Sequence, residues 1–146
     1  MKKSLVDIKD LLEQIQINHA NLNEFFFGSY VEATSRDAAT YPLMVATVQP
    51  STLTYKKTNI NIAITIVDKY KESDYYMRDD VMSDLLLITS DVRELMRKEM
   101  YDDFEISETI SVDPFVNYGQ DLTCGWIMNI TFEVDDVMNY CAVPNL

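Results

Sequence analysis

The chain contains one histidine and two cysteines, the residue types that most often act as bases and nucleophiles in enzymes. A catalytic pair would need Cys124 or Cys141 to meet His19 in space, with a thiol that ionises easily. No sequence signature of such a pair surrounds either cysteine. His19 falls on the apolar side of an amphipathic segment, which favours a histidine packed in the core or at an interface. Two cysteines alone build neither a disulfide framework nor a four-ligand metal site, so we expect both to be reduced and buried.

Adjacent acidic residues could bind a cation or act as an acid and a base. They occur as Asp79-Asp80, Asp102-Asp103 and Asp135-Asp136. Neighbouring side chains diverge on an extended backbone, so such pairs more often cap elements or lie in solvated turns. No EF-hand spacing is present, and the three glycines are too far apart for a phosphate-binding loop. We therefore predict no catalytic residue, no metal site and no cofactor, and a protein that is not an enzyme.

The composition predicts one acidic domain over residues 1–146. The 146 residues are 47% hydrophobic, which is ample for one core, and 24 acidic against 12 basic residues give a net charge of -12. This charge disfavours phosphate binding and favours basic partners. The first residues are amphipathic and charged, unlike a signal peptide, and no apolar run is long enough to span a membrane.

The positioning elements follow from the spacing of apolar residues. A three-four spacing predicts amphipathic helices over residues 4–23 and 80–99. Alternation of apolar and polar residues predicts strands, and the clearest has Ile60, Ile62, Ile64 and Ile66 on one face. The predicted strands cover residues 41–48, 59–67, 104–112 and 123–134. We expect residues 68–80 to form a projecting polar loop, and Asp113-Pro114 to lie in a turn.

These elements predict an α+β fold in the order α-β-β-α-β-β. Two amphipathic helices would cover one face of a four-stranded, mainly antiparallel sheet, forming a two-layer sandwich whose last two strands make a hairpin. Ala63, Val67 and Ile127 point away from the main apolar face, so the outer face is partly apolar and a partner subunit could cover it. An uncharged tail occupies about residues 137–146.

Exposed aromatic and apolar segments are the candidate subunit contacts. Four aromatics lie within residues 25–30, further tyrosines fall in the predicted loop, and the tail is uncharged. Internal packing or disorder is the alternative for each segment. The candidate interface residues are Phe25, Phe26, Phe27, Tyr30, Tyr70, Tyr75, Tyr76, Tyr140, Val143, Pro144 and Leu146.

Several short stretches resemble virion proteins of crAss-like and related tailed phages. They are residues 18–28 with Tyr41-Pro42-Leu43, Asp113-Pro114-Phe115 with residues 121–126, and residues 139–144. The resemblance implies a structural subunit, similar to tail terminators and head–tail connectors, that forms a homo-oligomeric ring in the neck of the virion. Its partners would be copies of itself and neighbouring neck, portal or tail proteins. DNA would pass through the channel without sequence-specific binding, and no membrane would be involved. The subunit would be made in the host cytoplasm.

Two other classes of function stay open on the sequence. A small acidic binding module, such as a regulatory or anti-defence protein, would engage one basic protein partner, and its binding would weaken with salt. A small hydrolase or transferase would act through His19 with a cysteine or a carboxylate. Replacing His19 with glutamine separates this last class, because a catalyst would lose turnover whereas assembly of a structural subunit would be unaffected.

Overall fold

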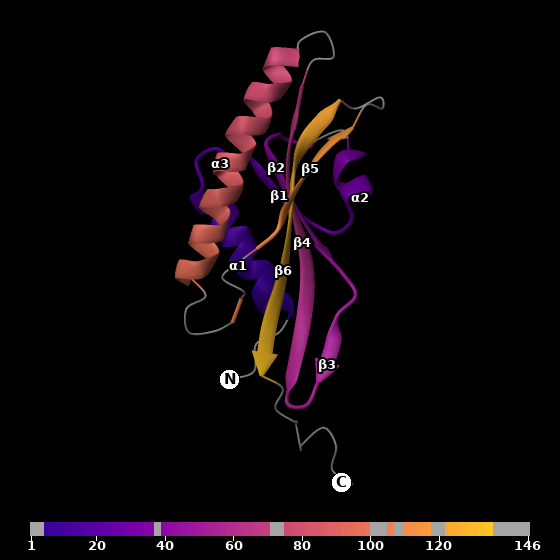
Figure 1. Cartoon of the computed structure of the whole chain (residues 1–146), viewed down its shortest axis with the longest axis vertical. Coiled ribbons are helices and arrows are strands. Elements are labelled where there is room, and N and C mark those ends of the chain that lie inside the picture. The colour runs from indigo at the N-terminus through magenta and orange to yellow at the C-terminus, as the bar shows by residue number, and fades with distance from the viewer. Residues whose placement is uncertain are drawn as a thin grey trace.

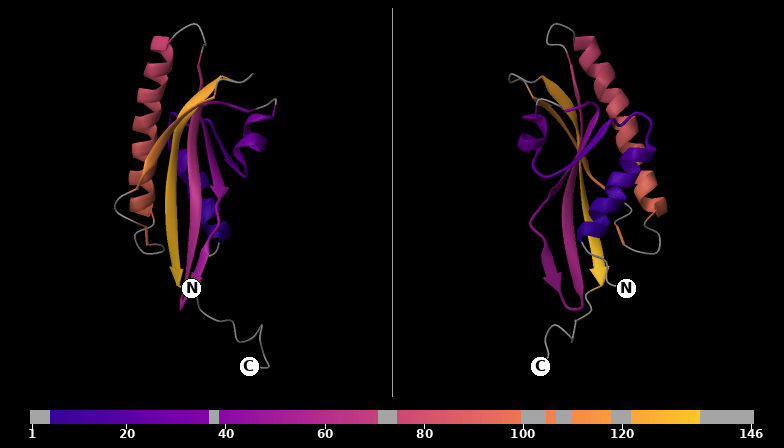
Figure 2. Two further views of the ribbon diagram at one scale, coloured as in Figure 1. Left: turned by 45° about the vertical axis from the view of Figure 1, so that its right-hand side comes forward. Right: turned by 180° about the vertical axis from the view of Figure 1, so that it is seen from behind.

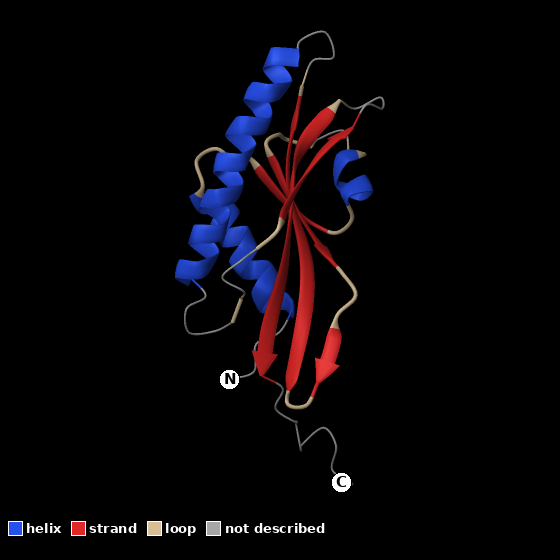
Figure 3. Ribbon diagram, in the orientation of Figure 1, coloured by secondary structure: helices blue, strands red, loops and turns tan. Residues whose placement is uncertain are grey.

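The chain forms three helices and six strands in the residues that a computed structural model describes, which are 5–36, 39–70, 75–99, 105–106, 110–117 and 122–135. Figures 1 and 3 show long strands flanked by helices. None of the described helices is long and apolar enough to cross a membrane. In chain order the elements are α1 (Leu5–Asn18), β1 (Glu24–Phe27), α2 (Tyr30–Thr34), β2 (Leu43–Val48), β3 (Thr52–Thr54), β4 (Lys57–Lys69), α3 (Tyr75–Glu99), β5 (Val112–Asn117) and β6 (Thr123–Asp135).

The strands form one open, mixed sheet in the order β1-β2-β4-β6-β5, with β3 paired to the start of β4. Only β1 and β2 run parallel, and all other pairs are antiparallel. The two 13-residue strands β4 and β6 pair along their whole length and form the centre of the sheet. The predicted α+β class is thus confirmed. The strand that pairs antiparallel with β6 is not the predicted run 104–112 but β5, which begins at Val112 and ends at Asn117; of the predicted run, Val112 is in β5 and Glu105 makes an isolated bridge to Glu133.

The main core lies between one face of the sheet and the two long helices. The predicted isoleucine face of β4 is confirmed, because Ile62, Ile64 and Ile66 are all buried there. Figure 2 shows α1 and α3 together on this side of the sheet. Their apolar residues meet those of β4 and β6 because a three-four spacing places them along one side of each helix. The helices contribute Ile8, Leu12, Ile15, Leu85, Val92 and Met96, and β6 contributes Met128, Ile130 and Phe132.

A second, smaller core occupies the opposite face, where the sequence predicted no helix. There α2 packs over one end of the sheet, on the other side from α3 (Figure 2). Tyr30 fixes this helix, because its hydroxyl and the Thr123 hydroxyl are hydrogen-bonded at 2.5 Å. The Tyr30 ring also meets Phe115 edge-on, with centroids 5.6 Å apart. The buried residues of this core are Ala33, Leu43, Val45 and Val67.

The outer face is less apolar than the sequence suggested. The second core covers Val67, and Ala63 is 8% exposed. Further along the same face, Thr131 donates a hydrogen bond to the Asn61 side chain at 2.6 Å, so polar groups occupy this part. Ile127, the third residue predicted on this face, is half-buried, so cover by a partner subunit stays a prediction.

The predicted count of four strands and two helices is too low. The missing elements are β1, α2 and β3, which span four, five and three residues. Elements this short contain too few residues to show a period in the sequence. The strand β1 forms by pairing with β2, and β3 forms by pairing with β4. Asp113 and Pro114 lie within β5 and not in a turn. A proline is tolerated there because β5 is an edge strand.

The predicted projecting loop over residues 68–80 is also wrong in most of its length. Asp68 and Lys69 continue β4, where they pair with Cys124 and Thr123 of β6. Tyr70 is only 7% exposed, and α3 already begins at Tyr75. The loop was predicted because its residues are charged, but backbone pairing with β6 continues the strand through charged residues too. Residues 71–74, like the predicted tail, lie outside the described residues.

Candidate functional site

A cleft of about 660 Å³ lies beside α3, where the segment between α1 and β1 and the end of β4 meet the helix. Leu85 and Ile88 of α3 are buried there, whereas Leu87 is 64% exposed at the cleft. The volume falls in the range typical of ligand and side-chain pockets. The residues that line it are Ala20, Asn21, Asn23, Pro42, Asp68, Val81, Asp84, Leu85, Leu87, Ile88 and Asp91.

Three carboxylates give this cleft a negative charge. Asp84 and Asp91 lie on the exposed side of α3, and Asp68 lies near the end of β4. Burial raises the pKa of the Asp68 carboxyl, while a hydrogen bond from the backbone N–H of Lys69 at 2.7 Å and the Lys69 charge act in the opposite direction. The cleft therefore combines acidic groups with apolar side chains, which suits a cationic and partly apolar guest.

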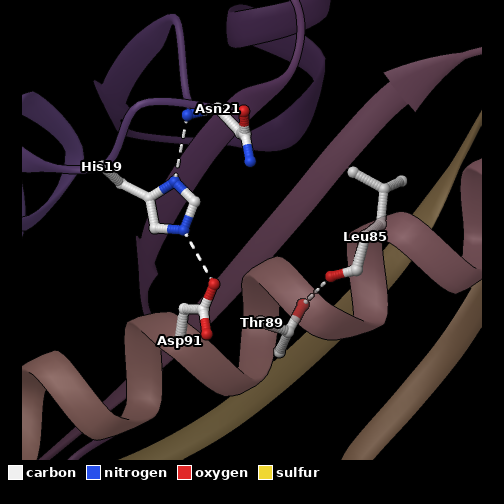
Figure 4. Close-up of polar contacts among 5 residues, drawn as sticks. All are labelled: His19, Asn21, Leu85, Thr89 and Asp91. Atoms are coloured by element: carbon white, nitrogen blue, oxygen red, sulfur yellow. Dashed lines mark hydrogen bonds and ion pairs between the residues drawn. The ribbon is translucent and has the colours of Figure 1, made fainter.

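His19 lies at one side of the cleft and connects the segment after α1 to α3 (Figure 4). Its Nε2 lies 3.1 Å from the Asp91 carboxylate, and its Nδ1 accepts a hydrogen bond from the Asn21 backbone N–H at 3.1 Å. With Nδ1 as the acceptor, Nε2 is the ring nitrogen that donates to Asp91. A general base needs one ring nitrogen open to its substrate, whereas both nitrogens of His19 are engaged. The predicted helix over residues 4–23 ends at Asn18, so His19 lies just after α1 and not on its apolar stripe, with a side chain that is 9% exposed.

We expect the His19→Gln variant to fold and associate as the wild type does, with a loss of about 1 kcal/mol in unfolding free energy. The loss is small because the Asp91 side chain that accepts the bond is 61% exposed and can turn to water. Chemical denaturation and light scattering of both proteins measure the two quantities. A variant that lost association altogether would show that His19 contributes to a subunit contact.

Cys124 is fully buried, as predicted, on β6 opposite Asp68. Burial raises the pKa of its thiol to about 11, and the nearby Asp68 carboxylate acts in the same direction. A thiol with such a pKa is a poor nucleophile near neutral pH, since the thiolate is the reactive form. Cys141, the other predicted buried cysteine, lies outside the described residues.

The acidic pairs are not gathered into a metal site in the part of the chain that the structure describes. Asp79 and Asp80 belong to the early turns of α3, and Asp135 ends β6. Among the described residues, no group of three or more histidine, cysteine or acidic side chains is placed to hold a metal ion. Asp102, Asp103 and Asp136 lie outside the description.

The β3–β4 hairpin is the second notable surface feature, and the sequence analysis missed it. It projects at the lower end of the sheet in Figure 1. Leu53 is 80% exposed and Tyr55 is 87% exposed, although both are large and apolar. Lys56 adopts a positive φ of 63° at the turn, and its ammonium lies 5.2 Å from the centre of the Tyr55 ring. Alternation of threonines with larger residues from Thr52 onward is the only signal that could have indicated a short strand.

The predicted interface aromatics lie mostly within the chain's own packing. Phe25 and Phe27 pack partly buried against the main core, and Phe26 against the second core. Tyr30 is half-buried, and the Tyr70 hydroxyl donates a hydrogen bond to the Asn117 carbonyl. Their role in subunit contacts stays a prediction. The side chains of Tyr75 and Tyr76, and Tyr140, Val143, Pro144 and Leu146, lie outside the description.

Comparison with known proteins gives no relative: no family model matches the sequence, and no curated protein matches it.

Proposed function

We propose that this protein is a structural subunit of a tailed-phage virion that closes into a homo-oligomeric ring in the neck, as a head–tail connector or tail terminator. The sequence resemblance to virion proteins of crAss-like and related phages suggests the setting. Much of the resembling sequence lies on described elements, in β1, β2, β5 and β6 and in the segment between α1 and β1. The ring would surround the DNA channel, and the net charge of -12 would keep the duplex from adhering to its wall.

The β3–β4 hairpin is the observation that carries this proposal. All six residues from Ser51 to Lys56 are exposed, and the apolar side chains of Leu53 and Tyr55 point into solvent. Single exposed apolar residues are common on monomers, and two on one projecting arm form a small apolar patch that a contact with another molecule would bury. A projecting element of this kind suits the heterologous contact of a ring, in which one patch meets a different patch on the neighbour.

Light scattering across a concentration series, combined with negative-stain images, tests the ring. We expect a mass that is a multiple of the 16.9 kDa chain and ring-shaped particles. A protein that stays monomeric up to its solubility limit would contradict the proposal.

The acidic cleft favours a second candidate, a monomeric binding module that engages one basic protein partner. The three carboxylates of the cleft would then pair with lysine or arginine side chains of that partner. In this case the purified protein is monomeric at every concentration, and its complex with the partner weakens as salt rises.

A further inference from the structure

The tip of the β3–β4 hairpin carries an exposed cation beside exposed apolar groups. Lys57, the neighbour of Lys56, forms an ion pair with Glu133 at 2.9 Å, within its own sheet. The Lys56 ammonium instead lies over the ring of Tyr55, and both side chains are exposed. In a chain with 24 acidic and only 12 basic residues, this tip is a local positive site on a negative molecule.

The cleft beside α3 has the complementary chemistry. Asp84 and Asp91 supply negative charge on the exposed side of the helix, and Asp68 adds a third carboxyl deeper in. Leu87, exposed at 64%, adds apolar surface at the cleft. An aromatic ring with an adjacent ammonium can therefore place its ring on Leu87 and direct its charge towards the carboxylates.

The two features cannot meet within one chain. The hairpin lies where β4 begins, at Lys57, and Asp68 lies near the end of this 13-residue strand. Figure 1 shows β3 at the lower end of the sheet and the first turns of α3 at the upper end. A contact between the two features must therefore join different copies, and it uses a different patch on each copy. Such heterologous contacts form rings when the rotation between neighbours closes.

We propose that the hairpin tip of one copy, with Tyr55 and Lys56, docks into the cleft of the next copy, where Lys56 faces Asp84 and Asp91. This contact rests on the proposed ring and specifies the two surfaces that join neighbouring subunits. It also gives a strongly acidic chain a way to associate with itself, since the Lys56 charge at the contact offsets part of the general repulsion.

Charge exchange between the two surfaces tests this contact. Lys56→Glu places two negative surfaces opposite each other, and Asp84→Lys places two positive groups opposite each other. Each variant alone should associate at least about tenfold more weakly than the wild type, as expected for close charge pairs across an interface. An equimolar mixture of the two variants should recover association to near the wild-type level, because each hairpin then meets a cleft of opposite charge. Mass by light scattering, at matched concentration and salt, measures all three samples.

Glu13→Lys is the matched control, because it replaces a negative charge with a positive one, as Asp84→Lys does, at an exposed position on α1. It should associate as the wild type does, and circular dichroism should show all variants folded, since the three side chains are exposed. If the wild type forms rings and the two variants do so equally well, or if their mixture does not recover, the docking contact is wrong while the ring stands. If the wild type never associates, both the ring and the contact fail.

Discussion

The Gly125→Ala variant should lose about 3 kcal/mol of unfolding free energy, with a melting temperature about 10 °C lower, and is the most damaging single-methyl change that we expect. A Cβ at this position would lie far inside the contact distance of the Ile66 carbonyl oxygen, and close to the Ile66 carbonyl carbon and the Val67 Cα. These are backbone atoms at the centre of the sheet, where Gly125 pairs with Val67. They can move only if β4 and β6 separate locally, which breaks hydrogen bonds of the longest strand pair.

Gly28→Ala is the matched control for this prediction. There the added Cβ would lie 2.6 Å from Cε1 of the Phe26 ring, the far end of a side chain that can turn away. Neither glycine has a positive φ, so backbone strain does not separate the two variants. We expect Gly28→Ala to change stability by less than about 1 kcal/mol. Urea unfolding, followed by circular dichroism and by the fluorescence of Trp126, measures both. Equal effects would show that the close approach at Gly125 is not what limits stability.

The elements that the sequence predicted are those whose own pattern is long enough to be seen. The isoleucines of β4, the alternation in β6 and the three-four spacing of α1 and α3 each extend over several turns or pairs. Burial of one face imposes such a pattern, so the main core could be predicted before any coordinates were known. The α+β class follows from the same regularity, whereas the alternation over residues 104–112 placed the partner strand of β6 too early in the chain.

The elements that were missed depend on contacts between distant segments. Phe25 to Phe27 form a strand because they pair with residues 44–46 of β2, which no local pattern reveals. The start of α2 has a local signal, since the Ser29 hydroxyl accepts the Glu32 backbone N–H at 3.1 Å, but five residues give no period. Asp113 and Pro114 have the composition of a turn, and pairing with β6 overrides it. Contacts with distant segments, and not the local preferences of the residues, determined the secondary structure of these segments.

The candidate site shows the same division. The burial of Cys124 followed from the alternation in β6. His19 was expected on the apolar stripe of a helix, but α1 ends at Asn18 and the residue lies in the segment after it. The cleft could not be predicted, since its carboxylates Asp68, Asp84 and Asp91 belong to two elements that meet only in the fold. The exposed hairpin was missed because the three residues of β3 are too few to show a period. Exposure of apolar residues is visible only once the rest of the chain is in place.

Labelling of Cys124 by a thiol reagent should be at least about 100-fold slower in the native protein than in the unfolded chain, at any pH below 9.0. The pKa of about 11, against the ordinary 9.0, makes the reactive thiolate about 100-fold scarcer, and full burial slows access further. A Cys141→Ser background leaves this thiol as the only one in the chain. Stopped-flow absorbance with an aromatic disulfide, with and without denaturant, measures the two rates.

The same thiol should make the fold sensitive to alkaline pH, in a direction that the pKa fixes. The folded state holds the neutral thiol, and its pKa lies above that of the unfolded chain. The unfolded chain therefore releases its proton first, and this contribution to stability is complete below pH 9.0 and is lost as the pH rises towards about 11. The variant Cys124→Ala in the same background should lack this part of the pH dependence.

The Asp68→Asn variant should lower the pKa of the Cys124 thiol, since the neighbouring carboxylate helps to raise it. Native labelling as fast as that of the unfolded chain would show that Cys124 is open to solvent and that burial does not control its pKa.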